Sequence, residues 1–333
     1  MPAPASSHPI QGRRIRNKAL ALVVILLTAA GSLTVGVGSM SLGDLWSTDG
    51  NNAALLLMAS RIPRTLALIL AGAGLAVSGA IMQMLARNRF AEPSTVGTAD
   101  SAALGMIVAL AIAPQMPVLG KMALAGGFAL MGTAIFLAIL RQIPLRSALM
   151  VPLIGIMFGG VVSAMGTFLA YRFDLLQSIG AWSGGDFSMV LRGRYELLWI
   201  ALALTLVAYA AAARFTLAGL GEAVARNLGL DYRAIVSLGL VIVSLVTASV
   251  VVTVGMVPFV GLVVPNLVSL VLGDNLQRTL PWVAISGAGL MLFCDLVGRL
   301  VIFPYEIPVG TVAGVIGAIF FLYLLLRRQP DVA

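Results

Sequence analysis

The chain has 333 residues, of which 60% are hydrophobic and only 10% are charged. Because soluble domains carry about 25% charged residues, this composition excludes an ordinary water-soluble domain and indicates a polytopic membrane protein. A mean hydropathy of +1.03 agrees with that class. The net charge of +8 does not indicate nucleic-acid binding, since the basic residues flank apolar runs, where they orient membrane proteins.

The N-terminal region predicts a retained membrane helix. Residues 1–18 contain four basic residues, and residues 19–40 form an apolar run. This run is longer than the 7–15 residues of a signal-peptide core. We therefore expect a cytoplasmic tail over residues 1–18, followed by the first transmembrane helix.

Ten apolar runs of roughly 20 residues are candidates to cross the membrane as helices. The run 257–273 is short and contains Pro265, but basic clusters at both termini place both ends in the cytoplasm and require an even number of spans. The expected fold is all-α, with one transmembrane domain over residues 19–328 and a C-terminal tail over 329–333. The predicted spans are 19–40, 62–85, 95–113, 119–140, 148–171, 195–214, 234–254, 257–273, 282–300 and 307–327.

The loop charges support this topology. It places fourteen Lys and Arg residues on the cytoplasmic side and seven outside, which is the bias expected for membrane proteins. Seven is still a large number for the outer side and suggests that some of these residues have a specific role. The seven are Arg61, Arg64, Lys121, Arg172, Arg192, Arg194 and Arg299.

The cytoplasmic segment 215–233 is amphipathic. Four apolar residues recur at helical spacing and form one stripe, whereas glycines divide the segment into short helices. The pattern fits a helix lying on lipid or a knob that docks in a groove of a partner protein. The stripe comprises Leu217, Leu220, Val224 and Leu228, and the glycines are Gly219, Gly221 and Gly229.

The sequence contains no motif for covalent chemistry. It lacks a phosphate-binding loop, a nucleophile elbow and a zinc-protease helix. The single histidine, His8, and the single cysteine, Cys294, cannot form a metal cluster or an internal disulfide. We therefore expect no enzyme and no cofactor bound by this chain. A metal carried by this protein would travel inside a chelate.

Seven motifs lie along the chain from about residue 55 to residue 328. They are Arg61-Ile-Pro-Arg64, Gly72 to Gln83, Asn88-Arg-Phe-Ala-Glu-Pro93, the segment 217–231, Gly255 to Pro265, Asp295 to Arg299, and Glu306-Ile-Pro-Val-Gly310. Together, and in this order, they resemble the iron-siderophore and cobalamin ABC permease family.

Three positions depart from the usual family pattern. Asn266 and Ser269 stand where the family usually has His and Arg, and Arg89 stands where it usually has Pro. The stretch from Val264 to Arg278 resembles a subgroup associated with catecholate siderophores, which often pairs two different permease chains. The resemblance therefore makes cobalamin a less favoured cargo.

The resemblance implies a permease subunit of an ABC importer in the bacterial inner membrane, translocating a ferric siderophore. Its partners would be ATPase subunits that bind ATP and Mg, a periplasmic or lipoprotein siderophore-binding protein, and a second permease chain in a heterodimer or homodimer. It assigns binding-protein docking to Arg61, Arg64 and Arg299. It assigns ATPase coupling to Leu217, Leu220, Gly221, Glu222, Val224, Arg226, Leu228 and Gly229. It leaves a pathway or structural role for Gln83, Asn88, Pro93, Pro265, Asn266 and Asp295.

Other interpretations of these residues remain open. Asp295 with Arg299, and Glu222 with Arg226, have the i, i+4 spacing of helical ion pairs and could be purely structural or solvated. The main rival function is a secondary transporter driven by an ion gradient, which would keep carboxylates near the bilayer midplane. A membrane scaffold without transport activity is the third possibility.

Overall fold

The computed structural model describes residues 57–143, 149–177, 179 and 184–326, and this part of the chain is helical without strands, confirming the all-α prediction. The tail 1–18, the predicted span 19–40 and the tail 329–333 lie outside it. The helices are η2 (Leu57–Arg61), α3 (Ile62–Leu85), α4 (Thr98–Ile112), α5 (Val118–Gln142), α6 (Met150–Arg172), α8 (Leu198–Ala210), α9 (Ala212–Gly219), α10 (Glu222–Asn227), α11 (Tyr232–Val254), α12 (Val260–Leu272), α13 (Leu276–Leu300) and α14 (Val309–Leu326).

The helices follow the predicted spans with three differences. Six helices of the described residues are long and apolar enough to cross a membrane, and the pair α8 and α9 makes a seventh if it counts as one span. That pair is bent by 66°, where the sequence predicted one helix over 195–214. Helices α4 and α12 are apolar but shorter than the predicted spans 95–113 and 257–273. The prediction of ten spans is therefore approximate.

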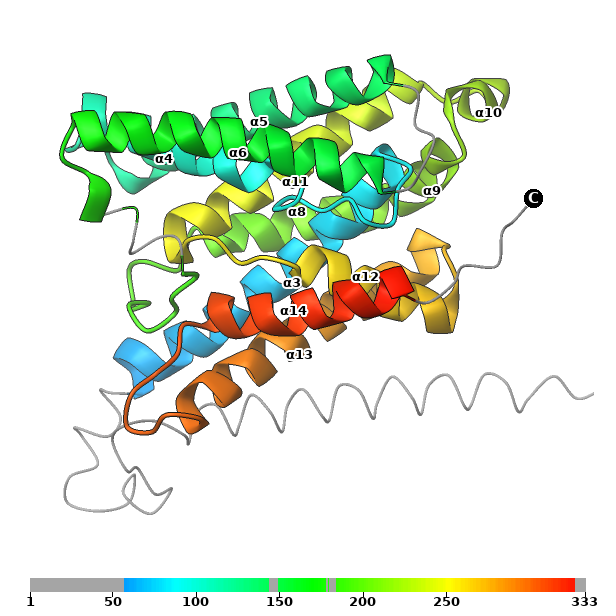
Figure 1. Ribbon diagram of the computed structural model, residues 1–333. Coiled ribbons are helices and arrows are strands. Elements are labelled where there is room, and N and C mark those ends of the chain that lie inside the picture. Colours follow the sequence, from blue (N-terminus) through cyan, green and yellow to red (C-terminus); the bar gives the residue numbers. More distant parts are fainter. Residues whose placement is uncertain (1–56, 144–148, 178, 180–183, 327–333) are drawn as a thin grey trace, which may run out of the picture.

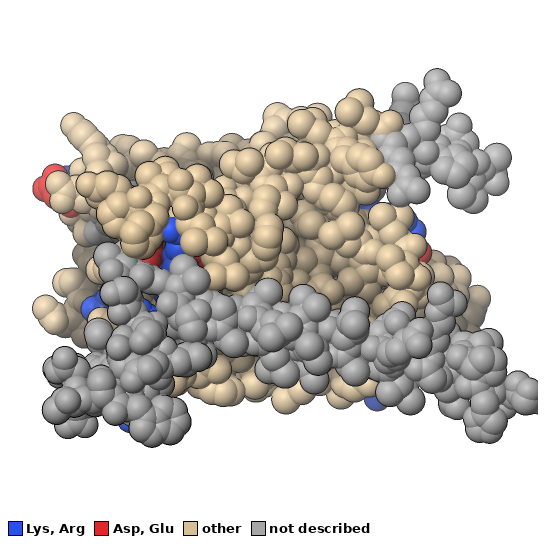
Figure 2. All heavy atoms as spheres, turned by 90° about the horizontal axis from the view of Figure 1, so that it is seen from below, with Lys and Arg blue, Asp and Glu red and all other residues tan. Residues whose placement is uncertain are grey.

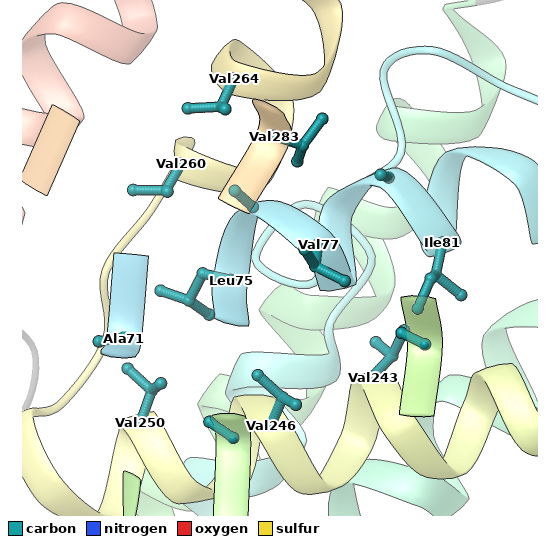
Figure 3. Close-up of a cluster of buried hydrophobic side chains, with 14 of the residues drawn as sticks. Ala71, Leu75, Val77, Ile81, Val243, Val246, Val250, Val260, Val264 and Val283 are labelled. Carbon is teal, nitrogen blue, oxygen red and sulfur yellow. The ribbon is translucent and has the colours of Figure 1, made fainter. Parts of the chain in front are cut away.

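Helix α3 is the centre of the molecule. It is almost entirely buried, whereas α6 and α14 expose most of their surface. Figure 1 shows α4, α5 and α6 on one side of α3, and α12, α13 and α14 on the other. In the core, Leu75 of α3 lies near Val246 of α11 and Val260 of α12 (Figure 3). The buried side chains are mostly aliphatic.

Glycines let α3 approach its neighbours at backbone distance. A Cβ atom at Gly79 would overlap the backbone of Gly261 in α12, and one at Gly72 would overlap the carbonyl of Gly287 in α13. Lipid tails are as apolar as leucine, so helices in a membrane associate through close packing rather than through the hydrophobic effect. These two contacts fix α3 against both helices.

Helices α4 and α12 are shorter than the hydrocarbon core of a membrane is thick. With 15 and 13 residues, they are only about 22 and 20 Å long, against a hydrocarbon core of about 30 Å. Each is preceded by a non-helical segment, and each starts at a residue with a left-handed backbone, Gly97 (φ 80°) and Phe259 (φ 67°). Irregular backbone at membrane depth requires protein partners for its polar groups.

Charged side chains gather toward the ends of the helices. Figure 2 shows one face on which the described atoms are almost free of Lys, Arg, Asp and Glu in the middle, with charges toward both ends. This distribution fits helices that cross an apolar layer and place their charged residues at its two boundaries.

The contact between α3 and α12 gives a test of the packing. Gly79→Ala should lower the free energy of unfolding by about 1–3 kcal/mol, because the added methyl group must displace backbone rather than a flexible side chain. Gly127→Ala is the matched control, since a Cβ there meets no atom within 4 Å. Thermal unfolding of the purified protein in detergent measures both. Equal melting temperatures for the two variants would contradict the close packing.

Candidate functional site

The start of α3 carries a buried ionic network made of Arg64, Asp295, Arg299 and Glu306, called here the Arg64 network. The Nε and Nη2 atoms of Arg64 donate to Oδ1 of Asp295 at 3.0 and 2.7 Å. Its Nη1 atom donates to Oε2 of Glu306 at 2.7 Å. The second carboxylate oxygen of Asp295 lies 2.7 Å from Nη2 of Arg299. Two cations and two anions therefore meet at one end of α3.

The network is balanced in charge and largely shielded from water. Asp295 is 0% exposed and Arg299 is 5% exposed. A buried ion costs several kcal/mol to remove from water, so it persists only with close partners. The structure confirms the i, i+4 pair of Asp295 and Arg299 that the sequence predicted.

The predicted docking arginines differ in exposure. Arg64 and Arg299 are buried and engaged with acids of their own chain, whereas Arg61 is half-buried at the end of η2. The sequence analysis assigned no role to Glu306. The sequence signal for Glu306 is that it is an acidic residue close to an apolar run, where an acid needs a cationic partner.

The opposite end of α3 meets the coupling segment, residues 215–233. Helix α9 ends at Gly219, and α10 begins after Gly221, whose φ of 111° requires glycine. Gly219 packs against Met84, and Gly221 lies beside the guanidinium group of Arg87. The segment also contacts α13, because the backbone N–H of Leu276 donates to Oγ1 of Thr216 at 3.1 Å. The predicted short helices interrupted by glycine are confirmed.

The coupling segment presents large apolar side chains on the protein surface. Leu220 is 61% exposed, Val224 41% and Leu228 56%, whereas Leu217 is half-buried on α9. The stripe therefore spans two helices rather than one. Glu222 and Arg226 form the predicted i, i+4 ion pair at 2.6 Å, and both are exposed. An exposed cluster of large apolar side chains is typical of an interaction surface.

The connection between α3 and α4, residues 86–97, caps α12 with a buried acid. Glu92 is 2% exposed, and its Oε1 atom accepts from the backbone N–H of Phe259 at 2.8 Å and from the hydroxyl of Ser94. Its carboxylate also bonds the backbone of Gly261 and Leu262, at the positive end of α12.

The candidate pathway or structural residues of this region make contacts within the chain. The side chain of Gln83 donates to the carbonyl of Gly261 at 3.3 Å, and Oδ1 of Asn88 accepts from the N–H of Phe90 at 2.8 Å. Pro93 is buried in the connection 86–97, and Pro265 is buried inside α12. The bond from Gln83 joins α3 to α12, the bond between Asn88 and Phe90 stays within the connection, and Glu92 joins the connection to α12.

The three departures from the family pattern lie together near the C-terminal end of α12. Nδ2 of Asn266 donates to the carbonyl of Arg89 at 2.8 Å. The guanidinium group of Arg89 pairs with Asp274 at 2.8 Å, and the hydroxyl of Ser269 donates to the other oxygen of the same acid. Residues that were unusual separately in the sequence thus form one connected set around Asp274.

Two cavities lie away from these contacts. An apolar groove of about 550 Å³ runs between α12 and α13, lined by side chains that include Val268, Trp282 and Phe293. A cavity of about 100 Å³ between α4 and α6 contains the carboxylate of Asp100. Within the described ranges, no three His, Cys, Asp or Glu side chains form a group able to hold a metal ion.

Within the part of the chain that the structure describes, six or seven helices long and apolar enough to cross a membrane define a multi-span membrane protein. The chain belongs to the FecCD transport family, whose model matches residues 20–327. That match covers almost the whole chain and places it among transport proteins rather than enzymes.

Similar proteins cover nearly the same length. The chain is 45% identical over 307 residues to the petrobactin import system permease protein YclN of Bacillus subtilis, covering 92% of this chain and 97% of the relative. It is 46% identical over 284 residues to the ferric-anguibactin transport system permease protein FatD of Vibrio anguillarum, covering 85% and 90%. A solved inward-facing metal-chelate type ABC transporter matches with a TM-score of 0.77 at 27% identity, covering 92% of this chain and 98% of that one.

Substitution of Asp295 tests how much the Arg64 network contributes to stability. Asp295→Asn should destabilise the protein by about 3–5 kcal/mol, because it leaves two buried guanidinium groups with one carboxylate. Glu222→Gln is the control: it also removes one acid from an i, i+4 pair, but the pair is exposed and contributes less than about 1 kcal/mol. Thermal unfolding in detergent should separate the two variants. Similar melting temperatures would contradict the buried network.

Proposed function

We propose that this chain is the membrane permease subunit of an ABC importer that moves a ferric siderophore, of the catecholate type, across the bacterial inner membrane. The single observation that carries this proposal is the 45% identity to a petrobactin import permease over nearly the full length of both chains. The permease itself performs no covalent chemistry. ATP and Mg are bound by a separate ATPase subunit.

The proposed topology places the Arg64 network on the outer side and the coupling segment in the cytoplasm, with both chain termini also cytoplasmic. It is supported by the position of the two surfaces at opposite ends of α3 and by the loop charges. A substrate-loaded binding protein docks at the end that contains Arg61, Arg64 and Arg299. Arginine suits this role because its guanidinium group binds carboxylates through two parallel hydrogen bonds.

The proposed coupling segment docks in a groove of the ATPase. Its exposed leucines supply apolar contacts, and the exposed pair Glu222–Arg226 supplies charge at the rim. Because the segment packs on Met84 and lies beside Arg87, movements of the ATPase reach the end of α3 directly. A second permease chain completes the pathway, and α6 and α14 offer the largest exposed apolar faces for such a chain or for lipid.

Two features favour this function over an ion-driven transporter. The buried carboxylate of Asp295 is paired with two arginines, so it is not poised as an exchangeable ion site. Glu92, the second deeply buried acid of the described residues, is occupied by the N-terminus of α12. Neither of these two carboxylates is open to an exchangeable ion.

Substitution of Leu220 tests the proposed coupling role. Leu220→Asp should reduce siderophore uptake at least tenfold, because a charge in the apolar contact prevents docking of the ATPase. The amount of permease in the membrane should stay unchanged. Leu220→Met keeps the apolar contact and should retain uptake. Uptake of labelled ferric siderophore by whole cells measures both. Normal uptake by Leu220→Asp would contradict the assignment.

Growth identifies the cargo. A strain lacking this permease should fail to grow under iron limitation on one class of ferric siderophore, expected to be catecholate, and should grow normally on ferric citrate or hydroxamates. A plasmid copy of the gene should restore growth. Growth on every siderophore in the panel, or uptake that continues when cellular ATP hydrolysis is blocked, would reject the proposed function.

A further inference from the structure

We infer that Glu306 occupies, on Arg64, the position that a carboxylate of the binding protein takes, and that docking exchanges one acid for the other. The exchange releases the segment 301–308 between α13 and α14. This inference rests on the proposed docking of a binding protein at the Arg64 end. It assigns Glu306 the role of an internal competitor that holds the permease in its undocked state.

The geometry divides the donors of Arg64 between two acids. Its Nε and Nη2 atoms both point to Asp295, whereas Nη1 alone bonds Glu306, at 2.7 Å. The bond to Glu306 can therefore be exchanged while the paired bonds to Asp295 remain. The Nε and Nη2 atoms of Arg64 thus serve the buried acid Asp295, whereas Nη1 offers a site for one further carboxylate.

The charge balance within the Arg64 network favours an exchange over an addition. Arg64 and Arg299 are matched by Asp295 and Glu306, so a further carboxylate at Arg64 would give this group a net negative charge. Like charges that are close together in a partly dry environment repel each other strongly. An incoming acid therefore binds Arg64 at low cost only if one of the two resident acids leaves.

Exposure determines which acid leaves. The side chain of Asp295 is 0% exposed and is also held by Arg299. The side chain of Glu306 is 25% exposed, so it already has access to water. An ionised Asp295 without its partners would remain buried, which is expensive, whereas Glu306 can turn outward and become hydrated. The leaving acid is therefore Glu306.

Release of Glu306 loosens the connection that leads into α14. Segment 301–308 is exposed at Val301, Phe303 and Tyr305, which are 63%, 63% and 75% exposed. The ion pair of Glu306 ties the segment to Arg64 of α3. Two backbone bonds tie it to α13, from the N–H of Val301 to the carbonyl of Val297 at 3.1 Å and from the N–H of Ile307 to the carbonyl of Gly298 at 2.9 Å. Loss of the ion pair removes the tie to Arg64 and leaves the bonds to α13. Docking would thus reach α14 through the acid that it displaces.

Removal of the competitor provides the first test. In the complete transporter, reconstituted in lipid nanodiscs, Glu306→Gln should bind the purified binding protein of the same importer about threefold to tenfold more tightly. It should also raise ATP hydrolysis measured without binding protein toward the docked rate. Asp174→Asn is the control, because it removes one negative charge from an exposed residue of the segment after α6, which lies outside the network.

A label in the segment provides a second, independent test. Tyr305→Cys can carry a spin label, since Tyr305 is exposed and the natural Cys294 is buried. Binding protein should increase the mobility of this label in the otherwise wild-type transporter. In the Glu306→Gln background, the label should already be mobile, and binding protein should change it little.

The outcomes separate this inference from the function on which it rests. If the wild-type transporter does not bind the binding protein, the docking proposal fails, and the exchange fails with it. If the wild type binds but Glu306→Gln binds equally or more weakly, or the label at position 305 does not respond to docking, the exchange is wrong while the docking stands. Tighter binding together with a pre-mobilised label supports the exchange.

Discussion

Close backbone contact of α3 with α12 and α13 is the constraint on which this structure depends. In lipid, an apolar helix gains little from burial alone, so the position of α3 is set by shape. Gly79 against Gly261 and Gly72 against Gly287 allow an approach that any side chain would prevent. Because α3 is held along its length, the groups at its two ends have fixed positions relative to one another.

The non-helical segments follow from the same environment. Where the membrane excludes water, the backbone groups at the start of a helix need partners within the protein. Glu92 meets this need for α12 from the connection that follows α3, and the side chain of Gln83 bonds the same turn. The connection 86–97 therefore belongs structurally to α12 as much as to α3. It also contacts α14, since the rings of Phe90 and Phe321 pack edge to face, 5.7 Å apart.

Much of the fold was predictable because hydropathy reports membrane spans directly. The i, i+4 pairs and the glycine-divided coupling segment were also predictable, because each depends on residues that are close in sequence. The 66° bend after α8 was not predictable. Glu92 caps a helix 167 residues away, and Arg89 meets Asp274 across 185 residues. Such contacts leave no local pattern, so the convergence of Arg89, Asn266 and Ser269 emerged only in three dimensions.

The two ends of α3 differ in how they can bind a partner. At the Arg64 end, charges are shielded from water and already neutralised, so under the proposed docking a partner gains affinity by replacing a resident acid. At the coupling end, the leucines are exposed, and the ion pair Glu222–Arg226 is solvated, so a partner gains affinity by burying apolar surface. Exchange of acids depends on the strength of the competing group, whereas apolar docking depends on the area buried. This difference supports the proposed docking of a binding protein at the Arg64 end and of the ATPase at the coupling segment.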